Sequence, residues 1–596
     1  MSLLETLNRL LVFREPQEPR YEFESGREDR PAAEKRAPSG TGQQAAGTPG
    51  DASAFERKQA QSRRLEAILK ENRPLCTNLD ENERLLKEIF REPDNKDIVF
   101  RPFSIGTERP RRALLVFFDG LVDTNRQNLS ILQPLMLFAR LRPDREPAQE
   151  NGPGTAGIEA REELAKRISE ALLPGNEVSS VGTVREVVED VLNANTALLV
   201  DGLDTALLIE TKAWATRGVG TPQVEAVIRG PQEAFTEQVR INVTLVRKTL
   251  RRSSLVTEFL PVGRMSPLQC AVMYLDDTAN PALVAEVKRR LKSIKADYVN
   301  ESGILEQFIE DTPGAPAPQT LATERPDRVV AGLVEGRVAV MVDGNPWALI
   351  VPTTFFSLMQ AAEDAYDRWP FGTYTRFVRY LGAGLALLLP GSYVALVTYH
   401  TEFLPTELLL AFTGAREPVP FPTVVEVLLM ETAFELIREA GVRIPGAVGT
   451  TLGIVGALIL GQAAVAANIV SPILIIIVAL TALGSFTIPN YPFSNTVRMY
   501  RFFYIALGGV LGLFGILIGL FVHLALVARM TSFGVPFLAP LAPVTRGAPD
   551  YLQRGPAWEQ EQRPDYLDPL RRRRQPRISR GWTRRRRKDD DRPGGR

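Results

Sequence analysis

The chain has 596 residues, of which 24% are charged and 44% hydrophobic, and a formal net charge of +1. That length allows three or four domains, and the near-zero charge is a cancellation, because residues 541–596 carry a net +8 and the preceding residues about −7. Two cysteines, Cys76 and Cys270, exclude a disulfide framework and match no metal spacing, and two histidines argue against a zinc site or a serine–histidine triad.

The first 77 residues are predicted to be an extension, disordered and helical, rather than a folded domain. Residues 17–60 are rich in Pro, Gly, Ala, Gln and charged residues, a composition typical of disorder. A charged pattern typical of a helix follows, "AFERKQAQSRRLEAILKENRPL". The start of the chain lacks the pattern of a signal peptide, so any membrane segment is expected inside the chain.

Residues 78–375 predict two similarly built soluble α/β subdomains, at 78–250 and 251–375. In each, an apolar run ending in Asp-Gly or Asp-Asp is followed by a helical pattern and then by two apolar runs around an Asp-Gly turn, the signature of a β-hairpin. The first runs are "ALLVFFDG" and "AVMYLDD", and the hairpins are "ALLVDGLDTALLIET" and "VAVMVDGNPWALIVPT". The same order of elements about 150 residues apart indicates an internal repeat.

The aspartates in these turns are a weak hint of a metal or phosphate site. They are Asp119, Asp201, Asp276 and Asp343. Asp and Gly commonly end strands and form tight turns, so a structural role is the preferred interpretation. The sequence contains no Walker or HExxH motif, and its one GxGxxG match, at residues 152–157, falls in a Pro/Gly-rich loop, so the sequence predicts neither an enzyme nor a bound cofactor or metal.

Residues 376–540 predict a polytopic bundle of transmembrane helices. About 20 apolar residues cross a bilayer, and four runs are long enough. They are 380–401, 446–467, 471–489 and 502–528. Basic residues follow the last run and continue into residues 541–596, a predicted disordered tail that either contacts anionic lipid or is simply solvated. By the positive-inside rule, both ends of this multi-pass chain are cytoplasmic.

Small and polar residues inside these runs predict close helix packing. Small residues recur every three or four positions, and such ridges let helix backbones approach within one subunit or between subunits. They are Gly449, Gly453, Ala457 and Gly461 in one run and Gly508, Gly512, Gly515 and Gly519 in another. Three polar residues are predicted to lie within the membrane: His523, which continues the second ridge, and the amides Gln462 and Asn468. The amides are expected to bridge helices or to line a wet passage, and bridging is favoured for Gln462. Pro390 and Gly391 predict a kink or hinge.

The segment 424–441, between the first two runs, predicts an apolar helix with an acidic stripe. Its acidic residues are Glu426, Glu431, Glu435 and Glu439, and the last three lie within roughly an 80° arc of a helical wheel. Several copies around an axis would form acidic rings, as in cation-conducting pores. Alternatively, the segment is a surface helix whose stripe pairs with Arg416, Arg438 or Arg443.

Four long blocks of sequence occur in an order that is specific to one family. They are "GLDTALLIETKAWATRGVGTPQVEAVIRGPQEAFTEQVRINVTLVRKTLR", "TERPDRVVAGLVEGRVAVMVDGNPWALIVPT", "PFPTVVEVLLMETAFELIREAGVRIPG" and "TLGIVGALILGQAAVAANIVSPILIIIVALTALGSFTIP". Over roughly residues 78–540, the chain resembles the A subunit of spore germinant receptors, the GerA-type family of endospore-forming bacteria. The N-terminal extension and the Arg-rich tail lie outside the resemblance.

The resemblance implies a protein of the spore inner membrane that acts with a permease-like B subunit and a lipoprotein C subunit. In this family, nutrient binding, assigned to the B subunit, triggers release of monovalent cations, and the A subunit is thought to form an oligomeric channel. No nucleic-acid partner is implied. One departure concerns the block "GQAAV", where we expect an acid in many relatives and this chain has Ala466. If the family's pore used that acid, ion selectivity here would come from elsewhere.

Two alternatives to a nutrient-gated channel stay open at the level of sequence. The first is a non-conducting scaffold or signal-transducing subunit of the same complex. The second is a paralogue such as stage V sporulation protein AF, which shares the same blocks.

Overall fold

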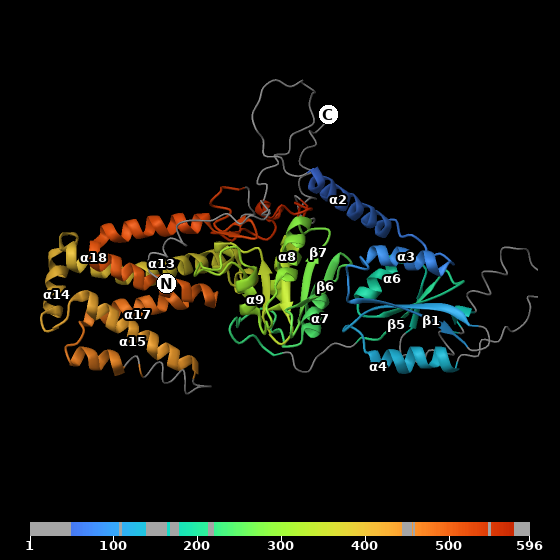
Figure 1. Ribbon diagram of the computed structural model, residues 1–596, viewed down its shortest axis with the longest axis horizontal. Coiled ribbons are helices and arrows are strands. Elements are labelled where there is room, and N and C mark those ends of the chain that lie inside the picture. The colour runs from blue at the N-terminus through green and yellow to red at the C-terminus, as the bar shows by residue number, and fades with distance from the viewer. Residues whose placement is uncertain are drawn as a thin grey trace, which may run out of the picture.

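The computed structural model describes residues 49–106, 110–138, 164–166, 168, 178–212, 220–443, 456, 459–545 and 550–576. Within these ranges the chain forms two five-stranded sheets, followed by a bundle of long helices and a C-terminal segment (Figure 1). Of the residues predicted to be disordered, 17–60, those from 17 to 48 lie outside the described residues, whereas 49–60 are helical, as part of α2 (Pro49–Lys70). The second predicted span, 446–467, also lies outside the described residues, apart from residues 456 and 459–467.

The first sheet is antiparallel throughout, with the strand order β1-β2-β4-β5-β3. Its strands are β1 (Ile98–Ile105), β2 (Arg111–Phe118), β3 (Val178–Val181), β4 (Thr196–Val200) and β5 (Ala206–Ile209). Alternate side chains of the central strands face two separate apolar cores. One core is closed by α3 (Leu79–Ile89) and α6 (Val184–Leu192), and the other by α4 (Thr124–Gln127), η1 (Asn128–Leu132) and η2 (Pro134–Phe138).

The second sheet repeats this topology, with the order β6-β7-β9-β10-β8. Its strands are β6 (Leu255–Val262), β7 (Leu268–Leu275), β8 (Leu321–Thr323), β9 (Val338–Val342) and β10 (Ala348–Val351). One face is covered by α7 (Val239–Thr249) and α10 (Pro326–Glu335), and the other by α8 (Pro281–Ser293) and α9 (Ser302–Ile309). The prediction of two similarly built α/β units is therefore confirmed. Because α7 packs on the second sheet, the second unit begins before the predicted boundary at residue 251.

The two units meet through their edge strands. The backbone N–H of Lys96 donates a hydrogen bond to the carbonyl oxygen of Thr257, at 2.9 Å. Nearby, Nε of Arg247 lies 2.5 Å from Oδ2 of Asp97, and these side chains are only 1% and 4% exposed. A buried ion pair thus joins a helix of the second unit to the first sheet.

The helix bundle follows the second sheet and extends away from it (Figure 1). Its elements are α11 (Phe355–Leu358), α12 (Glu363–Tyr366), α13 (Trp369–Tyr399), η4 (Thr401–Phe403), α14 (Thr406–Arg416), α15 (Thr423–Arg443), α17 (Pro472–Phe486) and α18 (Tyr491–Arg529). Among the described residues, α13 and α18 are long and apolar enough to cross a membrane. The predicted span 471–489 corresponds to α17, which has 15 residues and is about 22 Å long, shorter than a bilayer core.

The last predicted span, 502–528, is not one continuous helix, because α18 reverses direction at Gly512. This residue has φ 62° and ψ −148°, outside the helical region. The hydroxyl of Tyr504 lies 3.0 Å from Nδ1 of His523, whereas a straight helix would separate these two residues by about 28 Å. The segment is a helical hairpin, so the prediction of a single crossing here is wrong, and the glycines around Gly512 do not form one straight ridge.

Substituting Gly512 with alanine is expected to destabilise the bundle. Its backbone conformation is nearly restricted to glycine and typically costs other residues about 1–3 kcal/mol, and a Cβ would lie 2.8 Å from Nε2 of His400. The matched control is Gly384→Ala in α13, where no neighbour would approach a Cβ within 4 Å. There, alanine is expected to stabilise by about 0.5–1 kcal/mol. Thermal unfolding of the solubilised protein tests both, and equal melting temperatures would contradict the hairpin.

The chain enters and leaves the bundle beside the second sheet. Phe355, just after β10, packs against Tyr380 of α13 and Phe493 of α18, with ring centroids 6.4 and 5.6 Å apart. At the far end, the hydroxyl of Tyr399 donates to the carbonyl oxygen of Gly509, at 2.8 Å. The α13 segment from Tyr380 to Tyr399 is about 28 Å long, which matches the hydrocarbon thickness of a bilayer.

The C-terminal segment is folded as far as residue 576, so the predicted disordered tail is wrong for residues 550–576. Leu567 and Leu570 are buried, and the N–H of Leu570 donates to the carbonyl oxygen of Thr278, at 2.9 Å. The N-terminal α2 (Pro49–Lys70) joins the same place, because Lys58 pairs with Asp276 at 2.8 Å. Burial opposes ionisation of Asp276, but Lys58 and Arg91 outweigh it and lower its pKa.

Candidate functional site: a charged cluster inside the helix bundle

Two glutamates of α15 and two arginines of α18 form a cluster within the bundle. Oε2 of Glu431 lies 2.7 Å from Nη1 of Arg501. Glu435 bridges both arginines, with one oxygen 2.8 Å from Arg501 and the other 2.8 Å from Arg498. The two helices are therefore joined by ion pairs between residues more than sixty positions apart in sequence.

The centre of the cluster is fully buried but incompletely hydrogen-bonded. The side chains of Glu431 and Arg501 are 0% and 1% exposed. Neither carboxylate oxygen of Glu431 accepts a hydrogen bond from the described residues, and Nε and Nη1 of Arg501 donate none. Buried charges whose hydrogen-bonding capacity is only partly used are costly, so small shifts of α15 against α18 change their energy strongly.

The cluster lies within the apolar length of the bundle. Arg501 follows Phe493 by eight residues, which places it about 12 Å along α18 from the level of Tyr380. Neither arginine was predicted from the sequence to be a site residue. Charged residues at such a depth are rare and typically functional, and they require a partner.

The other two stripe glutamates also lie beside arginines of their own chain. Glu426 is 3.4 Å from Arg416 and accepts a hydrogen bond from the N–H of Ser471, and the exposed Glu439 is 2.6 Å from Arg443. Arg438 lies over the rings of Phe486 and Tyr491. Glu426 and Glu439 therefore pair as in the alternative of a surface helix, whereas Glu431 is buried and pairs with Arg501, which that alternative did not include. The local charge is +1, because four glutamates face five arginines, which are Arg416, Arg438, Arg443, Arg498 and Arg501.

Several glycines mark close contacts between backbones. A Cβ on Gly508 would lie 2.4 Å from the carbonyl oxygen of Gly391, so α13 and α18 touch at these two residues. A similar contact joins α13 and α17, where a Cβ on Gly484 would lie 2.5 Å from the carbonyl oxygen of Gly382. The second contact was not predicted from the sequence, since Gly382 and Gly484 are not part of an extended ridge.

The remaining predicted packing residues make different contacts. The two limbs of the α18 hairpin are residues 491–511 and 513–529. Gly515 and Gly519 lie against Leu507, between these limbs, and Gly461 makes ordinary contact with Ile475. Gly449, Gly453 and Ala457 lie outside the described residues. Pro390 and Gly391 lie within α13, which is helical on both sides of them, so no helix break accompanies the predicted hinge.

The three predicted intramembrane polar residues are not brought together. Gln462 and Asn468 are exposed in the single chain, and Asn468 ends its helix with a left-handed φ of 55°. His523 stacks on Tyr500, with ring centroids 4.3 Å apart, besides its contact with Tyr504. These contacts tie the two limbs of α18 together.

A second group of contacts connects the bundle to the second sheet. Oδ2 of Asp311, in the loop between α9 and β8, accepts hydrogen bonds from Oγ1 of Thr531 at 2.6 Å and from the N–H of Gly534 at 3.2 Å. The same loop receives a hydrogen bond at Pro316 from Oγ1 of Thr496, at 2.6 Å. Residues near both ends of α18 are thus held by one loop of the soluble unit.

Glu310 makes this loop sensitive to pH. Burial, together with the neighbouring Glu306 and Asp311, raises the pKa of Glu310 to about 8. An unfolded glutamate titrates near 4.3, so the stability from this proton is complete below about pH 4 and is lost as the pH rises through 8. Glu310→Gln is therefore expected to flatten the decline in melting temperature between pH 5 and pH 9. Parallel pH curves for the variant and the original chain would contradict this.

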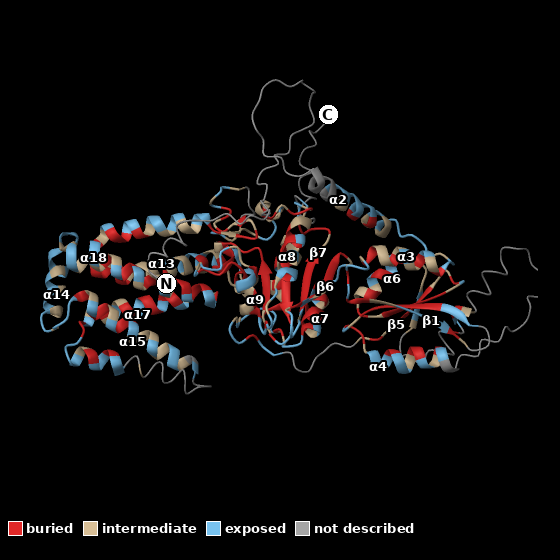
Figure 2. Ribbon diagram, in the orientation of Figure 1, coloured by how far each residue is buried: buried red, intermediate tan, exposed pale blue. Residues whose placement is uncertain are grey.

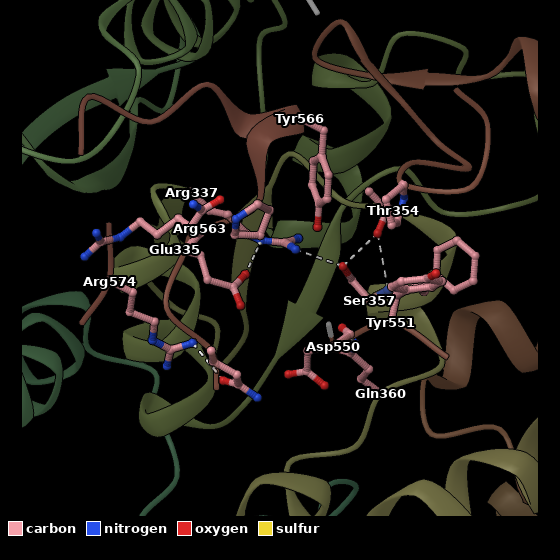
Figure 3. A pocket seen from close by; sticks show the side chains of 15 residues that line it. Glu335, Arg337, Thr354, Ser357, Gln360, Asp550, Tyr551, Arg563, Tyr566 and Arg574 are labelled. Carbon is pink, nitrogen blue, oxygen red and sulfur yellow. Dashed lines mark hydrogen bonds and ion pairs between the residues drawn. The ribbon is translucent and has the colours of Figure 1, made fainter. Parts of the chain in front are cut away.

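The base of α13 is held by ion pairs to α12 and to the C-terminal segment. Arg376 lies 3.0 Å from Asp364 and 2.6 Å from Asp550. Beside this contact, Figure 3 shows polar side chains around a small space, with Arg337 bonded to Glu335 and Ser357. The space of about 30 Å³ can hold water but not a metabolite-sized ligand. The described residues contain no group of three or more His, Cys, Asp or Glu side chains that could hold a metal ion.

Comparison with known proteins identifies relatives over most of the chain. The family described as Bacillus/Clostridium GerA spore germination protein matches residues 84–566. Spore germination protein KA of Bacillus subtilis (strain 168) is 37% identical over 472 residues, which are 79% of this chain and 84% of that protein. The "uncharacterized membrane protein YfkQ" of the same strain is 37% identical over 495 residues, 83% of this chain and 92% of that protein.

Among solved structures, the crystal structure of the N-terminal domain of the A subunit of the Bacillus megaterium spore germinant receptor GerK3 is similar to part of this chain. The sequence identity is 30%, and the match covers 48% of this chain and 98% of that domain, with a TM-score of 0.35.

Proposed function

The chain belongs to the GerA family of spore germination proteins, and from this premise we propose that it is the membrane-embedded A subunit of a spore germinant receptor, which transmits a nutrient signal to a cation-conducting helix bundle. The family match covers both sheets and the bundle. The proposed subunit is not an enzyme, and its task is to couple a change in the soluble units to a change in the membrane.

The observation that carries this proposal is the buried ion-pair cluster between α15 and α18. Arg501 and Glu431 are almost completely buried within the apolar part of the bundle, and α18 is held to the soluble unit near both of its ends. A movement of the loop around Asp311 would therefore change the fit of α18 against α15. A shift of a few kcal/mol is enough to change the populations of a closed and an open state.

The proposed partners are the permease-like B subunit, the lipoprotein C subunit and further copies of this chain around a pore. The proposed location is the inner membrane of the spore, and the similarity to a protein named as a membrane protein supports a membrane location. The chain enters and leaves the bundle beside the second sheet, which supports the part of the proposal that places both ends of the chain on one side of the membrane, and we propose that this side is cytoplasmic. We propose no role in binding nucleic acid.

Reconstitution tests the proposed channel against the alternatives. The chain is incorporated into liposomes with its B and C partners, and K⁺ efflux is recorded before and after addition of the nutrient. The proposal expects efflux that depends on both the nutrient and this chain. If the partners assemble only with the chain but no ions pass, the chain is a scaffold. If they assemble and respond without it, it is an accessory paralogue.

A further inference from the structure

Helix α14 is apolar but has no buried residue. It comprises Thr406–Arg416, with the sequence TELLLAFTGAR, and connects α13 to α15. Leu408 and Leu410 are 43% and 67% exposed, and Phe403 just before the helix is 73% exposed. A helix with apolar residues on most of its circumference is expected to be covered by protein or by lipid, so something outside the single chain covers α14.

This helix lies at the end of the bundle that is farthest from the two sheets (Figures 1 and 2). It begins seven residues after Tyr399, where α13 ends, and it is held to the bundle by the ring contact of Phe412 with Tyr393 and by the ion pair of Arg416 with Glu426. The turn of α18 at Gly512 is at the same end. Exposed apolar residues adjoin this turn, namely Val510, Leu511 and Phe514.

The length of α14 and its position along the bundle determine whether it can cross a bilayer or lie in its surface. Its 11 residues span about 16 Å, too short to cross a bilayer. It follows an apolar stretch of α13 whose length of about 28 Å equals one hydrocarbon thickness. At the opposite end of that stretch, α13 exposes Trp369 and Tyr374, residues typical of a membrane–water interface. If one surface of a bilayer lies at these aromatic residues, beside the second sheet, then the opposite surface of the same bilayer, here called the far membrane surface, lies at α14.

We propose that α14 lies in the far membrane surface, with Leu408, Leu410 and Phe403 at the boundary between lipid headgroups and acyl chains. This inference rests on the proposed membrane location. Residues 400–418 contain three acids, Glu402, Glu407 and Glu417, and one arginine, Arg416. Since this segment is net acidic, apolar burial rather than attraction to anionic headgroups holds it in place, and zwitterionic phosphatidylcholine is sufficient.

The test uses fluorescent labels on the full chain in phosphatidylcholine nanodiscs, quenched by lipids brominated at shallow or deep acyl positions. Single cysteines are introduced as Leu410→Cys, Leu517→Cys and Met265→Cys in a Cys76→Ser background, and the buried Cys270 is retained. Leu517 is exposed on the second limb of α18, within the expected acyl region, and Met265 is 81% exposed in a turn of the second sheet.

The label at position 410 is expected to be quenched about twofold more by shallow than by deep bromines, with no dependence on salt. The label at 517 should favour deep bromines, and the label at 265 should respond only to aqueous iodide. Iodide quenching at 410 equal to that at 265 would overturn the inference. Protection at 410 from both quenchers would also overturn it, by identifying a second protein surface as the cover. If the label at 517 is not quenched by lipid either, the proposed membrane location fails instead.

Discussion

Replacing Arg501 with glutamine is expected to destabilise the helix bundle by about 3–5 kcal/mol, because the variant leaves the buried carboxylate of Glu431 without its cation. Glu435 retains Arg498 as a partner, so the loss is concentrated on Glu431. The measurement is thermal unfolding of the solubilised chain, together with the yield of folded protein. The matched control is Arg443→Gln, whose partner Glu439 is 64% exposed, and it should change little.

A second variant separates lost pairing from lost volume. In Glu431→Leu with Arg501→Met, both buried charges are removed and the space remains filled, so stability is expected to recover most of the loss. Failure of this recovery, or an equal loss in the Arg443→Gln control, would contradict the importance of the buried pair.

The same pairing changes what is expected of glutamine substitutions in the acidic stripe. If the stripe formed a ring around ions, Glu431→Gln with Glu435→Gln would reduce cation flux and leave assembly intact. In the structure this double variant leaves Arg498 and Arg501 unpaired inside the bundle. We therefore expect assembly to be lost together with flux. Intact assembly with reduced flux would instead favour the ring.

The sheets could be predicted from sequence because their signals are local. Continuous apolar runs such as Leu114–Phe118 mark strands that are buried on both faces, and Asp-Gly turns follow them. Gly202 and Gly344, in the two equivalent hairpin turns, have φ values of 89° and 83°, which glycine tolerates best. Strand order and the packing of α7 depend on contacts between distant residues, so the boundary between the units was not predictable in this way.

The bundle was harder to predict because hydropathy does not report direction. The residues on both sides of Gly512 are equally apolar, and nothing in the pattern indicates that α18 turns back there. Arg498 lies between the predicted runs 471–489 and 502–528, and its partner Glu435 lies 63 residues earlier on another helix. The composition of residues 550–576 indicated disorder, yet Leu567 is buried and Arg571 pairs with Glu66 and Asp277. In each case the deciding partner is remote in sequence.

The contact between the two sheets has the same physical character as the cluster in the bundle, and its disruption is expected to have an equally large effect. Arg247 pairs with Asp97, donates hydrogen bonds to the carbonyl oxygen of Leu255 and to Oγ1 of Thr257, and lies 4.2 Å from the ring centroid of Phe118. These partners belong to both units, so one side chain fixes β1, β2 and β6 relative to each other.

Arg247→Met is therefore expected to destabilise the soluble units by about 3–5 kcal/mol, because Asp97 would remain buried without its cation. Adding Asp97→Asn should restore part of that stability. Limited proteolysis between the sheets, followed together with thermal unfolding, tests whether the units separate.

If the units transmit a signal to α18 as one body, Arg247→Met should also abolish nutrient-dependent K⁺ efflux at temperatures where the bundle stays folded. Normal efflux with separated sheets would mean that the signal enters through the second unit, which holds α18 through Asp311 and Pro316.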